Sequence, residues 1–66
     1  MTLKQEEFLQ EIEFKSSILD EITQQVRITT DEETLESLKR LGDMVASEIK
    51  IMLLVYDIMF SKVHLN

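Results

Sequence analysis

The chain has 66 residues and a mass of 7.8 kDa, with no cysteine, no proline and a single glycine. A chain of this length buries only about 60% of its unfolded surface on folding alone, and it has no cysteine for disulfides or metal sites to compensate. Its 13 acidic and 7 basic residues give a net charge of −6, which disfavours direct binding to nucleic acid or anionic membranes. The composition therefore favours a small domain that is stabilised by association with another chain.

The first predicted element is a helix over residues 3–27. Apolar side chains recur at alternating spacings of four and three residues, which is the period of one helix face in a two-helix seam. The positions in this stripe are Phe8, Ile12, Lys15, Leu19, Ile22 and Val26. Lys15 either pairs with an acidic neighbour or lays its stem along the seam with its ammonium in water, and we expect the second arrangement. Thr2 followed by Gln5 predicts a capping box at the start of this helix.

A short turn is predicted at residues 28–30. Ile28, Thr29 and Thr30 are consecutive β-branched residues, which weaken helix propensity locally. Thr30 with Glu33 predicts a second capping box, so the next helix should begin at about residue 31. Because the segment holds no glycine or proline, a single continuous or kinked helix is the alternative.

The second predicted helix spans residues 31–63 and is the longer of the two. Its seam positions again alternate at spacings of four and three: Leu38, Gly42, Val45, Ile49, Met52, Tyr56, Met59 and Val63. A short connection favours antiparallel neighbours, so the predicted fold is all-α, an antiparallel two-helix hairpin forming one domain over residues 1–66. We expect Gly42 to lie opposite Ser16 and Ser17, where small residues would let the backbones approach closely.

Residues 49–60 contain ten apolar residues in twelve, more than one companion helix can cover. A helix that is apolar on all sides must be buried on all sides, which favours a second protein surface. The candidate partner-binding residues are those outside the seam: Ile51, Leu53, Leu54, Val55, Ile58 and Phe60. The segment is too short to span a membrane, and Lys50 and Asp57 interrupt it. Self-association into a helical bundle is the alternative to a heterologous partner.

Enzymatic chemistry is not expected from these residues. His64 is the single histidine, and there is no cysteine, so neither a catalytic constellation nor a cofactor or metal site is predicted. The carboxylate pairs Glu7 and Glu11, and Glu32 and Glu36, are typical of a solvated helix face. An acidic helix face could instead imitate nucleic acid towards a DNA-binding protein; its residues would be Glu6, Glu7, Glu11, Glu13, Asp20 and Glu21.

The segment DEETLESLKRLGDMVASEIKIMLLVYDIMF, residues 31–60, resembles the YscE/SsaE-like family of small type III secretion needle co-chaperones. The shared features are an acidic helix start after a polar turn, then leucines, then an end rich in Ile, Leu and Tyr. The resemblance implies a hairpin that stabilises a larger helical-repeat chaperone. The two proteins together would keep the needle subunit soluble in the cytoplasm before export. The alternative function is a small phage- or plasmid-encoded regulator that binds and inhibits a host protein, as a homodimer or a nucleic-acid mimic. No basic segment followed by an apolar stretch is present at the start, so we expect a cytoplasmic location.

Overall fold

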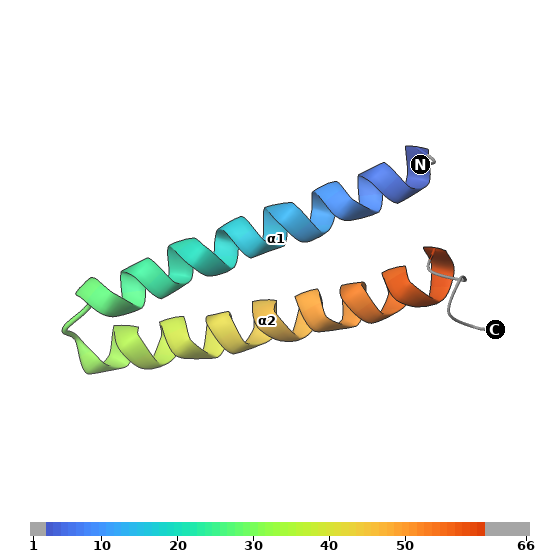
Figure 1. Ribbon diagram of the computed structural model, residues 1–66. Helices are drawn as coiled ribbons and strands as arrows, with labels where there is room; N and C mark the ends of the chain where they lie inside the picture. The colour runs from blue at the N-terminus through green and yellow to red at the C-terminus, as the bar shows by residue number, and fades with distance from the viewer. Residues whose placement is uncertain (1–2, 61–66) are drawn as a thin grey trace.

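The computed structural model describes residues 3–60, which form two helices, α1 (Leu3–Ile28) and α2 (Glu32–Phe60). The helices lie side by side and antiparallel, so the start of α1 and the end of α2 are at the same end of the molecule (Figure 1). With 26 residues in α1 and 29 in α2, the prediction of an all-α hairpin with a longer second helix is confirmed. The predicted continuation to residue 63 lies outside the described residues.

The turn occupies residues 29–31, one residue later than predicted, because Asp31 rather than Thr30 caps α2. Asp31 Oδ2 accepts hydrogen bonds from the backbone nitrogen of Thr34 at 2.9 Å and from Thr34 Oγ1 at 2.7 Å. An aspartate combines a strong capping acceptor with a negative charge at the positive end of the helix. The expected capping box of Thr30 and Glu33 is therefore wrong, and the hydrogen bonds from Thr34 lower the pKa of Asp31. The expected box at Thr2 lies outside the described residues.

The core of the hairpin is thin. Its buried apolar side chains are Ile12, Ile22 and Val45, and all three belong to the predicted seam. None of the described side chains is less than 2% exposed, because a two-helix hairpin has one interior side and solvent on every other. The molecule measures 50 × 21 × 13 Å, so it is about one helix thick in its shortest direction.

An aromatic cluster closes the end of the hairpin that is remote from the turn. The ring centroids of Phe8 and Tyr56 are 6.1 Å apart, those of Phe8 and Phe60 are 6.1 Å apart, and those of Tyr56 and Phe60 are 5.1 Å apart. Gln5 Nε2 donates a hydrogen bond to the Tyr56 hydroxyl at 2.9 Å, which ties the polar tip of that ring to α1. Phe60 therefore contacts α1, and the expectation that it points away from the seam is wrong.

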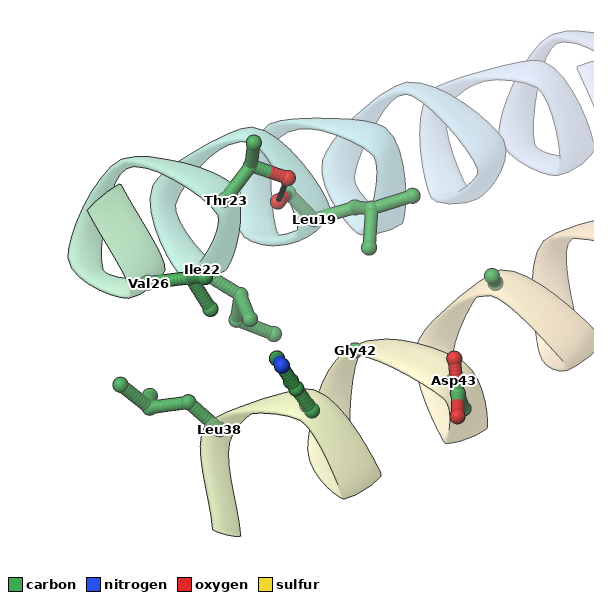
Figure 2. Close-up of a pocket in the computed structure, with 9 residues that line it drawn as sticks. Leu19, Ile22, Thr23, Val26, Leu38, Gly42 and Asp43 are labelled. Atoms are coloured by element: carbon green, nitrogen blue, oxygen red, sulfur yellow. Dashed lines mark hydrogen bonds between the residues drawn. The ribbon is translucent and has the colours of Figure 1, made fainter. Parts of the chain in front are cut away.

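Gly42 faces Leu19 and Ile22, not Ser16 and Ser17 as expected (Figure 2). A turn that lies one residue later moves the pairing towards later residues of α1, which is the direction of this difference. A Cβ atom added at Gly42 would lie 3.4 Å from Ile22 Cγ2 and 4.0 Å from Leu19 Cδ1. A shallow hollow surrounds this point, between the last turns of α1 and the first turns of α2.

Candidate protein-binding surface

A second row of large apolar side chains runs along α2 and is open to solvent. Its members are Met44 (55% exposed), Ile51 (61%), Leu54 (60%) and Ile58 (65%). Together with exposed Ser47 they are spaced at three, four, three and four residues, the same period as the seam with α1. We call these five residues the outer stripe.

The outer stripe lies on the side of α2 that faces away from α1. Leu54 is nine residues from buried Val45, which places the two side chains about 180° apart around the helix axis. The α1 helix therefore covers none of this row, and a further helix could lie along it without displacing α1. The outer stripe thus has the spacing of a second helix-packing face, on a helix whose first such face already packs against α1.

The structure brings together three of the six predicted partner-binding residues, Ile51, Leu54 and Ile58, within the outer stripe. Val55 is half-buried at the edge of the stripe. Leu53 is exposed, but it lies about 100° around the helix from Leu54 and outside the stripe. Phe60 belongs to the aromatic cluster.

Met44 and Ser47 are members of the outer stripe that the sequence analysis missed. The signal that could have found them is the spacing itself, because the alternation of three and four runs back from Ile51 to both positions. A count of the apolar residues left over from the seam does not reveal them, because it ignores whether those residues form a second regular row.

A shallow depression lies in the middle of the outer stripe and is lined by Ser47, Lys50, Ile51 and Leu54. These residues stand at positions i, i+3, i+4 and i+7 of the helix. Four side chains in this arrangement form the hole that receives one side chain of a neighbouring helix in knobs-into-holes packing. The shape of the surface is therefore suited to a helix.

An ion pair crosses between the two helices beside the seam. Lys15 Nζ donates a hydrogen bond to Glu48 Oε1 at 2.9 Å and lies 3.8 Å from Glu11 Oε2. The expectation that the Lys15 ammonium stays in water is therefore wrong, because the register brings the Glu48 carboxylate within its reach. The hydrogen bond to Glu48 is the main cause that raises the pKa of Lys15.

Between residues 3 and 60, neither helix has the length and apolar character needed to cross a membrane. Within the same range, no three His, Cys, Asp or Glu side chains are grouped around a position for a metal ion. His64 lies outside the described residues.

Comparisons of the chain with protein-family models, with curated proteins and with solved structures find no match. The resemblance of residues 31–60 to the YscE/SsaE-like co-chaperones therefore stays a prediction.

Proposed function

We propose that this chain is a non-enzymatic binding protein that packs the outer stripe of α2 against a helix of another protein. The observation that carries the proposal is the regular row of exposed apolar side chains on the side of α2 opposite α1. Contiguous exposed apolar surface of this kind is typical of protein interaction sites. An amphipathic helix laid along such a row is a common mode of recognition.

The free energy available at the outer stripe is large for so small a protein. Met44, Ile51, Leu54 and Ile58 are each between 55% and 65% exposed. Full burial of a large apolar side chain contributes about 1.5–3 kcal/mol, so covering what remains exposed would contribute about 4–7 kcal/mol in total. Small domains have total stabilities of about 5–15 kcal/mol. A partner at this surface would therefore stabilise the hairpin substantially.

The more specific form of the proposal is a co-chaperone role in type III secretion. The resemblance of residues 31–60 supports it, and the hairpin with a longer, more apolar second helix is compatible with it. In this role the hairpin covers apolar surface of a helical-repeat chaperone in the cytoplasm. The chaperone in turn binds the needle subunit until export.

Co-expression with a helical-repeat chaperone and a needle subunit from the same genome tests the proposal. We expect the tagged wild-type chain to co-purify with the chaperone, and Leu54→Glu or Ile58→Glu to abolish this while helix content is retained by circular dichroism. Phe14→Glu is the matched control, because Phe14 is 62% exposed but lies on α1. Phe60→Glu is not a suitable variant, because it would disrupt the aromatic cluster.

Each failure has a distinct meaning. If the wild type does not co-purify with the chaperone, the secretion role is wrong. If the wild type co-purifies and both stripe variants do so equally well, the outer stripe is not the binding surface.

A further inference from the structure

We infer that the outer stripe also pairs with the outer stripe of a second copy of this chain, in an antiparallel dimer of hairpins. This dimer uses the same surface as the proposed function, the outer stripe. It does not depend on which heterologous partner binds there. It rests on the arrangement of charges along the edge of the stripe and on the depression within it.

Lys50 and Asp57 lie on the same edge of the outer stripe, because they are seven residues, or about two helical turns, apart. Asp43 lies a further seven residues back on that edge. When two identical helices pair in antiparallel fashion, this edge of one copy runs beside the same edge of the other. The charged residues on this edge of one copy therefore face the charged residues on the same edge of the second copy.

One register of this pairing brings opposite charges together. If Ile51 is level with Leu54 of the second copy, the residue level with Lys50 is residue 55 of that copy, and Asp57 is the nearest position on the shared edge. The two-fold symmetry of the pair then forms the Lys50–Asp57 contact twice. Opposite charges at such flanking positions set the orientation and partner choice of paired helices.

The neighbouring arrangements bring like charges together. A shift of one heptad in one direction sets Lys50 against Lys50 and Asp43 against Asp57. A shift in the other direction sets Asp57 against Asp57. A parallel, in-register pair sets Asp43 against Glu48 of the other copy. Among these arrangements, the charge pattern therefore favours the antiparallel register that pairs Lys50 with Asp57.

The depression at the middle of the stripe fits the same register. Leu54 of the second copy arrives at the level of the hole formed by Ser47, Lys50, Ile51 and Leu54. Because α1 covers the opposite side of α2, both hairpins keep their own seams in the dimer. The dimer would shield the outer stripe until a heterologous partner replaced the second copy.

Sedimentation equilibrium of charge-reversed variants tests this inference. We expect the wild type to dimerise, and we expect Lys50→Asp and Asp57→Lys each to weaken dimerisation about tenfold or more, because each variant alone places two like-charge contacts in the dimer. An equimolar mixture of the two variants should regain dimerisation as a mixed pair, since opposite charges then meet at both contacts. The double variant Lys50→Asp/Asp57→Lys should dimerise as the wild type does. Lys4→Asp is the control, because it changes the net charge as Lys50→Asp does but is exposed on α1, away from the outer stripe.

A wild type that remains monomeric at all concentrations would overturn the inference. A dimer whose mixed variants fail to recover would overturn the antiparallel arrangement on which it depends. A monomeric wild type that still co-purifies with a chaperone would reject the dimer and leave the proposed function standing. A wild type that dimerises but does not co-purify with a chaperone would reject the secretion role and leave the dimer standing.

Discussion

Replacing Gly42 with alanine should stabilise the hairpin by about 1 kcal/mol. Gly42 is within α2, where glycine is less favourable than alanine because its backbone loses more conformational freedom on folding. The added Cβ would lie 3.4 Å from Ile22 Cγ2 and 4.0 Å from Leu19 Cδ1, which is ordinary van der Waals contact. The substitution therefore gains helix propensity and a methyl contact without forcing the helices apart.

The free energy of unfolding can be measured by urea denaturation followed by circular dichroism, at one fixed protein concentration because dimerisation makes stability concentration-dependent. A gain of this size corresponds to a rise in Tm of roughly 4–8 °C for a domain this small. Gly42→Leu is the contrasting variant and should destabilise by about 1–3 kcal/mol, since its side chain would overlap Ile22 and Leu19. If Gly42→Ala lowers the stability instead, the spacing of the two helices at this point is wrong.

Three further predictions concern individual contacts. At concentrations that keep the chain monomeric, Leu54→Glu should change the free energy of unfolding by less than about 0.5 kcal/mol. Phe60→Ala should lower the free energy of unfolding by about 1–2 kcal/mol, because the aromatic cluster is lost. Equal effects of the two variants in thermal melts would contradict this. Because hydrogen bonds from Thr34 lower the pKa of Asp31 below 3.8, the stability they contribute is present above that pH and is lost as the pH falls through the lowered pKa. The Tm difference between wild type and Asp31→Ala should therefore narrow between neutral pH and about pH 2, and a constant difference would exclude the cap. A double-mutant cycle on Lys15 and Glu48 should give a small favourable coupling energy that shrinks with added salt, as expected for an exposed ion pair. Because the pKa of Lys15 is raised from 10.5, this coupling energy should persist up to pH 10.5 and be lost as the pH rises through the raised pKa.

The seam could be predicted from the sequence because it depends on periodicity alone. Ile12, Ile22 and Val45 are each at a position that the alternation of four and three residues assigns to the interior. The existence of two helices and the greater length of the second follow from the same pattern.

Features that depend on register could not be predicted in the same way. Thr30 and Asp31 are adjacent residues that both cap helices well, and choosing the wrong one moves the turn by a residue. The pairing of the helices depends on the turn, so the neighbours of Gly42 differ from the expected ones, and Lys15 has a partner, Glu48, where none was expected. Phe60 was misplaced because its position lies at the edge of the seam, where a large ring can still reach Phe8.

The rate of thiol alkylation at Ser47→Cys tests most directly whether another chain covers the outer stripe. The wild type has no cysteine, serine and cysteine are close in size, and Ser17→Cys on α1 provides an exposed reference outside the stripe. We predict that alkylation at position 47 slows as the protein concentration rises or as a partner is added, while alkylation at position 17 stays constant. Equal and constant rates at both positions, with and without a partner, would contradict the account.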